Sequence, residues 1–193
     1  MNFKNKIEDS ILGSINTKKV LLEKHSNEIE QIGIILGEAV KNGNKIMFCG
    51  NGGSAADAQH LAAELVVRLR PDFNRRALPG LALTVDSSVL TAGGNDYGYD
   101  SIFSRSVEAF GNKGDVLIGI STSGNSKNVK LAIDKANELG VISIGLLGKD
   151  GGYIKESCQH SLIIPSENTA RIQESHILVG HIWCEMIEEI ACY

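Results

Sequence analysis

The chain is poor in aromatic residues, in positive charge and in long apolar runs, and each shortage excludes a class of protein. Aromatic residues make up only 5% of the 193 residues, too few to suggest a surface on which nucleic-acid bases stack. The formal net charge of −4 argues against a DNA- or RNA-binding surface. No stretch reaches the roughly 20 apolar residues that a membrane span needs, so we expect no membrane partner.

Cysteine is sparse as well. The four cysteines, Cys49, Cys158, Cys184 and Cys192, form no C-x-x-C pair, which argues against a zinc finger and against a disulfide framework. We expect them to be reduced and to serve as small apolar side chains. The first nine residues contain no apolar signal region, so we expect a cytoplasmic protein.

Helical patterns and short apolar runs alternate along the chain. Because the runs are apolar throughout, they are typical of strands buried on both faces of a parallel sheet. The sequence therefore predicts one α/β domain over 1–193, a three-layer αβα sandwich with a five-stranded parallel sheet and extra N-terminal helices. The expected helices are 1–43, 54–69, 99–110, 127–139 and 169–190, and the expected strands are 46–49, 81–85, 116–120, 141–147 and 161–164.

Two turns rich in serine and glycine each lie between an expected strand and an expected helix. The first is Cys49-Gly50-Asn51-Gly52-Gly53-Ser54 and the second is Ser121-Thr122-Ser123-Gly124-Asn125-Ser126. Such turns serve as helix N-caps, and they also expose N–H groups and hydroxyls that can hold a phosphate. Neither fits the two common nucleotide-binding patterns, which favours a monophosphate. Since both should lie at the carboxyl edge of the sheet, they predict an enzyme acting on a small phosphorylated metabolite.

Candidate acid, base and metal-binding side chains lie on two of the expected helices. His60 and Glu64 are four residues apart, so they share one helix face. This spacing is common in surface ion pairs, and it also suits a general base, a metal-binding pair, or both. Gln173 and His181 are eight residues apart, which is about 12 Å along a helix axis. One chain could hardly bring both to one small site, so we expect a homo-oligomer with a pocket shared between subunits.

In combination these segments resemble the phosphoheptose isomerases, which have the sugar isomerase (SIS) fold. The likeness rests on C-G-N-G-G-S-x-x-D-A-x-H-x-A-x-E, G-N-D-Y-G, I-S-T-S-G-N-S and A-R-I-Q-E-x-H, and it covers essentially the whole chain. The resemblance implies a flavodoxin-like SIS fold and the conversion of sedoheptulose 7-phosphate to D-glycero-D-manno-heptose 7-phosphate. That reaction is the first step towards nucleotide-activated heptose for lipopolysaccharide or capsule. It also implies a homotetramer with active sites between subunits, in which residues 1–43 pack.

The resemblance assigns roles to individual residues. The general base falls on Glu64 and its partner acid/base on His181. The residues that would contact the substrate are Asn51, Gly52, Gly53, Glu64, Asn95, Asp96, Ser121, Thr122, Ser123, Ser126 and Gln173. The ligands of one zinc ion per site would be His60, Glu64, Gln173 and His181. The chain departs from the family pattern at Val66-Val67-Arg68-Leu69, where T/S-G-R-Y is usual, and at Ala170, which replaces an acidic residue of some members.

Two other functions stay open at this stage. One is a non-catalytic SIS adaptor of the type that associates with the replication initiator DnaA, although such a relative lacks the glutamate and the late histidine that are present here. The other is an isomerase or sensor for a hexose or pentose phosphate, although such relatives usually lack the R-I-Q-E-x-H pattern.

Overall fold

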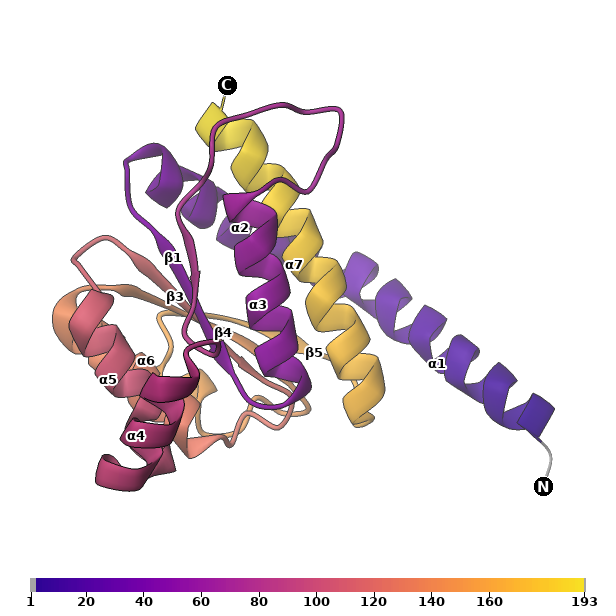
Figure 1. Cartoon of the computed structure of the whole chain (residues 1–193). Helices are drawn as coiled ribbons and strands as arrows, with labels where there is room; N and C mark the ends of the chain where they lie inside the picture. Colours follow the sequence, from indigo (N-terminus) through magenta and orange to yellow (C-terminus); the bar gives the residue numbers. More distant parts are fainter. Residues whose placement is uncertain (1–2, 193) are drawn as a thin grey trace.

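The structure, a computed structural model, describes residues 3–192 as helices and strands around one parallel sheet (Figure 1). The strands are β1 (Ile46–Gly50), β2 (Gly80–Ala82), β3 (Val116–Ser121), β4 (Ile142–Gly148) and β5 (His160–Ile164). The helices are α1 (Phe3–Lys24), α2 (Ser26–Lys41), α3 (Gly53–Val66), α4 (Ser87–Tyr97), α5 (Ile102–Phe110), α6 (Lys127–Leu139) and α7 (Thr169–Cys192), with short 3-10 turns η1 (Tyr99–Ser101) and η2 (Lys155–Ser157).

The strand order is β2-β1-β3-β4-β5, and every neighbouring pair is parallel. This is the doubly wound order of flavodoxin-like folds, so the expected fold class is confirmed. Side chains of β1 alternate between two cores. Ile46 and Phe48 pack with α2, α3 and α7, whereas Met47 and Cys49 pack with α5 and α6. The sheet is therefore covered on both faces, which explains why its strands are apolar throughout.

The second strand is shorter than the sequence predicts. The expected strand 81–85 ends at Ala82, although the Leu83 N–H still donates to the Phe48 carbonyl at 2.9 Å. The chain then turns because the Asp86 side chain accepts a hydrogen bond from the Val89 N–H at 3.0 Å and caps α4. Helix α4 was not predicted from the sequence, because its Gly93 and Gly94 are weak helix formers.

No helix among residues 3–192 is both long and apolar enough to cross a membrane. The four cysteines are free, as expected. Helix α1 extends away from the body of the molecule (Figure 1), and its exposed apolar side chains are Phe3, Ile7, Ile11, Leu12, Ile15 and Leu22.

Helix α7 holds a histidine in the core. His176 is 0% exposed, and its Nε2 lies 3.0 Å from the Leu147 carbonyl oxygen, so Nε2–H donates and Nδ1 carries the lone pair. That Nδ1 has no hydrogen-bond partner. Protonation there would bury an uncompensated charge, and burial accordingly lowers the pKa of His176 to about 4, against the opposing effect of its bond to Leu147.

Stability should therefore depend on pH through His176. The unfolded chain binds the proton with an ordinary histidine pKa, so the unfolding free energy falls as pH drops from about 6.5 towards 4. The Gln side chain of His176→Gln can still donate to the Leu147 carbonyl oxygen. Between pH 7 and pH 4.5, we expect the unfolding free energy of this variant to fall by about 2 kcal/mol less than that of the unmodified protein. Urea unfolding at the two pH values measures this difference, and equal pH dependence in both proteins would contradict the assignment.

Candidate active site

Both serine- and glycine-rich turns lie at the carboxyl edge of the sheet, as predicted. They follow β1 and β3, which are neighbours with Gly50 paired to Ile120. Each turn leads into a helix, α3 after the first and α6 after the second. The N-termini of α3 and α6 therefore lie next to each other beyond the carboxyl ends of two adjacent strands. Ligands bind at this place in open α/β sheets.

The first turn is held by an amide pair. The Asn51 amide donates to Asn128 Oδ1 at 2.8 Å, and the Asn128 amide donates back to Asn51 Oδ1 at 2.8 Å. The Tyr99 hydroxyl also donates to Asn51 Oδ1 at 3.0 Å. Gly52 has a φ of 58°, which a residue with a Cβ rarely adopts. Neither Asn128 nor Tyr99 was expected at the site from the sequence, although Asn128 lies two residues after the second turn and Tyr99 directly follows the G-N-D-Y-G motif.

The second turn gathers hydroxyl groups. The Oγ atoms of Ser121 and Ser126 are 3.0 Å apart, and the Gly124 N–H donates to Ser121 Oγ at 3.1 Å. Ser126 occupies the N-cap of α6, but its side chain makes no capping bond to the helix. The Val129 N–H in the first turn of α6 donates to Asn128 Oδ1 at 2.9 Å, which leaves the N–H groups of Lys127 and Asn128 for an anion. Gly124 has a φ of 67°, and a Cβ there would overlap the Gly151 carbonyl, so the tight turn requires glycine.

Asn95 and Asp96 lie in the last turn of α4, where the Asn95 amide donates to the Asp96 carboxylate at 2.7 Å. Within residues 3–192 neither side chain hydrogen-bonds to the two turns. The connection runs instead through Tyr99 in η1, which follows α4 and bonds Asn51. The structure thus brings this segment near the first turn without a direct contact from the two expected residues.

Helices α3 and α7 run side by side in the same direction (Figure 1). A Cβ on Gly53 at the start of α3 would overlap the Gln173 amide, and a Cβ on Gly180 would overlap Leu61 two turns later. Glycine at both positions permits this close approach. As a result, side chains at matching heights on the two helices meet.

His60, Glu64 and His181 come together on these helices. His60 Nε2 lies 2.9 Å from His181 Nε2 and 3.3 Å from Glu64 Oε1, and the Glu64 side chain is 18% exposed. In the neutral state, one imidazole must donate to the other across the short Nε2–Nε2 contact. The structure therefore assembles two imidazoles and one carboxylate beside each other, which suits proton transfer.

The expected metal ligands are only partly gathered. The Gln173 side chain lies against Gly53 at the start of α3. Gln173 and His181 are eight residues apart, which corresponds to about 12 Å along the axis of α7. Within residues 3–192, no group of three His, Cys, Asp or Glu side chains is arranged to hold a metal ion. Imidazole nitrogen and carboxylate oxygen are nevertheless donors that zinc accepts, so the chemistry of His60, Glu64 and His181 fits the ion.

Asp57 was not singled out from the sequence, although it is the aspartate of the first motif. It lies on α3 one turn before His60, and its Oδ2 is buried without a hydrogen-bond partner. Burial raises the pKa of Asp57 to about 6, and His60 partly opposes the rise. A group with such a pKa close to neutrality is suited to proton exchange.

The two departures from the family pattern lie at helix ends. Arg68 is exposed just beyond α3. Ala170 lies in the first turn of α7, where its N–H donates to Asn168 Oδ1 at 2.9 Å. The missing acidic side chain at position 170 is thus not needed to cap this helix.

The amide pair between Asn51 and Asn128 should contribute a measurable coupling free energy. Asn128 is 3% exposed, so removing either amide leaves a buried polar group unpaired. We expect a double-mutant cycle of Asn51→Ala and Asn128→Ala to give a coupling of about 1 kcal/mol or more in urea unfolding. Simple additivity of the two single losses would show that the pair does not stabilise the turn.

Known proteins match the chain over nearly its whole length. Residues 13–148 match the family model of the SIS domain. The phosphoheptose isomerase of Clostridium acetobutylicum is 55% identical over 188 residues, covering 96% of this chain and 95% of that protein. The structure of phosphoheptose isomerase GmhA from Neisseria gonorrhoeae is 42% identical with a TM-score of 0.91, covering 97% of this chain and 100% of that one. A phosphoheptose isomerase structure from Francisella tularensis is 35% identical with a TM-score of 0.93, covering 98% and 100%. The chain belongs to the phosphoheptose isomerases of the SIS-domain family.

Proposed function

We propose that this protein converts sedoheptulose 7-phosphate to D-glycero-D-manno-heptose 7-phosphate, the first step of nucleotide-activated heptose biosynthesis. Its membership of the family supports the reaction. The observation that carries the proposal is the contact of His60 with both Glu64 and His181, on α3, which starts at the first serine- and glycine-rich turn, and on α7 beside it. The adaptor alternative has no need of that constellation.

The isomerisation moves a proton between C1 and C2 of the sugar through an enediol. Glu64 would take the carbon-bound proton and return it to the neighbouring carbon. His181 would donate a proton to the carbonyl oxygen and accept one from the hydroxyl. Each positioned acid or base typically contributes about 10²–10⁴-fold to the rate. Glu64 is half-buried beside His60, a place in which a carboxylate is kept from full hydration.

The 7-phosphate would bind at the second turn. Ser121, Thr122, Ser123 and Ser126 offer hydroxyls there, and the open start of α6 adds N–H groups and the positive end of its dipole. The remaining substrate contacts would come from Asn51, Gly52, Gly53, Asn95, Asp96 and Gln173. Binding the distant phosphate holds the reacting carbons in place for the acid and base.

A zinc ion would be held by His60, Glu64 and His181, and the fourth expected ligand, Gln173, would have to come from a neighbouring subunit. When bound, zinc would polarise the oxygens on C1 and C2 as a Lewis acid. The residues of the chain itself supply the proton transfers and the phosphate contacts described above.

We also propose a homotetramer whose active sites lie between subunits. Helix α1 exposes a row of apolar side chains, which a partner would cover. An apolar groove of about 490 Å³ between α1, α2 and α7 continues that surface, with Leu21, Leu22, Ile29 and Ile182 among its lining residues. The separation of Gln173 from His181 along α7 supports sites that combine residues of different subunits.

A cytoplasmic location is the natural one for this activity. The four cysteines are free, as is usual in a reducing compartment.

The catalytic assignment predicts distinct losses for three variants. Glu64→Gln and His181→Ala should lower kcat by about 10²-fold or more while phosphate binding persists, because each removes a proton-transfer group. Ser123→Ala should mainly weaken substrate binding. Isomerisation of sedoheptulose 7-phosphate, assayed with and without a chelator, measures these effects and the need for a metal. Near wild-type turnover in Glu64→Gln or His181→Ala would refute the roles given to them.

The assembly prediction concerns α1. Ile7 and Ile11 are 58% and 56% exposed, so charging both should cost little in a monomer and much in an interface. We expect the double variant Ile7→Asp and Ile11→Asp to lower the mass measured by light scattering, whereas Lys19→Asp on the same helix serves as the charge control. A wild-type monomer at micromolar concentration would contradict the tetramer.

A further inference from the structure

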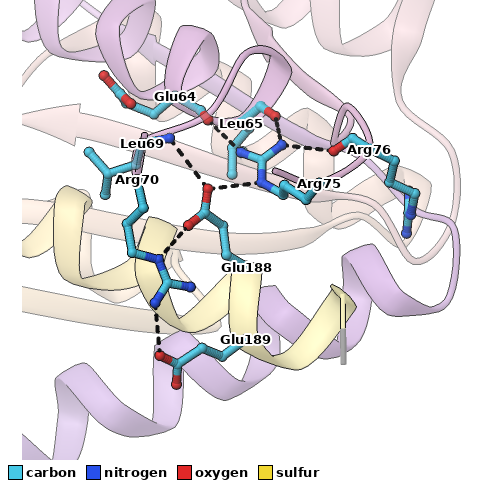
Figure 2. Close-up of polar contacts among 8 residues, drawn as sticks. All are labelled: Glu64, Leu65, Leu69, Arg70, Arg75, Arg76, Glu188 and Glu189. Carbon is cyan, nitrogen blue, oxygen red and sulfur yellow. Dashed lines mark hydrogen bonds and ion pairs between the residues drawn. The ribbon is translucent and has the colours of Figure 1, made fainter. Parts of the chain in front are cut away.

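A buried carboxylate joins the segment after α3 to the end of α7 (Figure 2). Glu188 on α7 is 0% exposed. Its Oε1 accepts hydrogen bonds from Arg75 Nε at 2.8 Å and from the Leu69 N–H at 3.3 Å, and its Oε2 accepts from Arg70 Nε at 2.9 Å. Arg70 also bonds Glu189 at 3.3 Å. Two arginines therefore share one carboxylate in the interior.

Of these two arginines, Arg75 also hydrogen-bonds the backbone at the end of α3, whereas Arg70 does not. Arg75 Nη2 donates to the Glu64 carbonyl oxygen at 2.7 Å, and its Nη1 donates at 2.9 Å to the Leu65 carbonyl oxygen, which also accepts from the Leu78 N–H at 3.0 Å. The Arg75 side chain is 2% exposed. Figure 2 shows the Glu64 carbonyl pointing towards Arg75 while the Glu64 carboxyl group points away from this cluster. The Arg75 guanidinium thus hydrogen-bonds the backbone of Glu64, while the Glu64 carboxyl group stays free to contact His60.

The local sequence explains why the end of α3 needs the hydrogen bonds from Arg75. A helix end leaves carbonyl oxygens without partners, and a glycine just after the helix often satisfies them. Here α3 ends at Val66 and is followed by Val67 and Arg68. Arg75 takes the role of such a cap, and its positive charge suits the negative end of the helix dipole.

We propose that Arg75, anchored by Glu188, is a positioning residue that fixes Glu64 relative to His181. The inference rests on the proposed function, in which these two residues move protons. His181 and Glu188 lie two turns apart on α7, and Glu64 lies on α3, so the guanidinium connects the two helices that carry the reacting groups. A misplacement of about 1 Å in such a pair can cost about 10²-fold in rate.

Arginine is required for this role because of its shape. Its planar fork donates in several fixed directions at once, whereas a lysine ammonium is a single charge on a flexible stem. Arg75→Lys keeps the charge beside Glu188 and should lose the bonds to the two carbonyls. Truncation to alanine is unsuitable, because it leaves the buried carboxylate with less compensation.

Arg70 supplies the matched control. It bonds the same carboxylate and is 30% exposed, but it makes no bond to the end of α3. Arg70→Lys therefore weakens the hydrogen bonding of Glu188 without releasing the Glu64 carbonyl oxygen. A purely structural role of the cluster would make the two lysine variants behave alike.

The experiment compares Arg75→Lys with Arg70→Lys in full-length protein at a temperature where both are folded. We expect Arg75→Lys to lower kcat for sedoheptulose 7-phosphate by about tenfold or more with little change in KM, and Arg70→Lys to stay within about twofold of the unmodified protein. Hydrogen exchange of the amides at 64–68 should be faster in Arg75→Lys only, because the Glu64 carbonyl oxygen in the last turn of α3 loses its hydrogen-bond partner.

Equal kcat values, or equal exchange at 64–68, in the two variants would overturn the inference. If Arg75→Lys does not fold, Glu188→Gln replaces it, since it weakens the anchor and leaves Arg75 on the two carbonyls. Its kcat should then fall by more than that of Arg70→Lys, and an equal value would count against the role. If the unmodified protein had no isomerase activity, the proposed function would be refuted. Hydrogen exchange at 64–68 in the two variants would still test whether Arg75 stabilises the end of α3.

Discussion

The parallel packing of α3 against α7 is the constraint on which the site depends. Gly53 and Gly180 have no side chains to keep the helices apart, and so Gln173 and Leu61 come into contact with the opposite helix. Because the two helices run in the same direction, residues seven or eight positions after the contact of Gly53 with Gln173 also lie next to each other. His60 and His181 are such a pair, and their Nε2 atoms are 2.9 Å apart. A larger side chain at either glycine would separate the groups that we assign to proton transfer.

The sheet places the other half of the site at the start of these helices. Strands β1 and β3 are neighbours, so their turns open side by side at one edge. The first turn leads directly into α3 and the second into α6. The turn that we propose for the phosphate, before α6, and the helix that carries Glu64, α3, therefore begin side by side at the ends of neighbouring strands. At its far end, α3 is fixed by Arg75 and Glu188, so both ends of the helix are tied to other elements.

Much of this arrangement could be predicted from the sequence. Apolar runs specified buried strands, and the two serine- and glycine-rich turns were correctly predicted to lie at the carboxyl edge of the sheet. Helical rise alone showed that Gln173 and His181 are too far apart to meet on one chain, and the structure agrees. The second strand was predicted at 81–85 but ends at Ala82, and α4 was missed, because the Asp86 side chain caps a helix directly after this apolar run. Asn128, Tyr99 and Glu188 were missed for another reason: their partners are distant in sequence, and only the tertiary fold brings them together.

The central claim is that the carboxyl group of Glu64 faces the reacting carbons of the phosphorylated ketose while the phosphate lies in the second turn. A crystal structure of the Glu64→Gln variant with sedoheptulose 7-phosphate bound tests this most directly. The account predicts the side chain of residue 64 beside C1 and C2, the imidazole of His181 beside their oxygens, and the phosphate against Ser121–Ser126. A sugar bound with C1 and C2 away from residue 64, or with its phosphate at another edge of the sheet, would contradict the account.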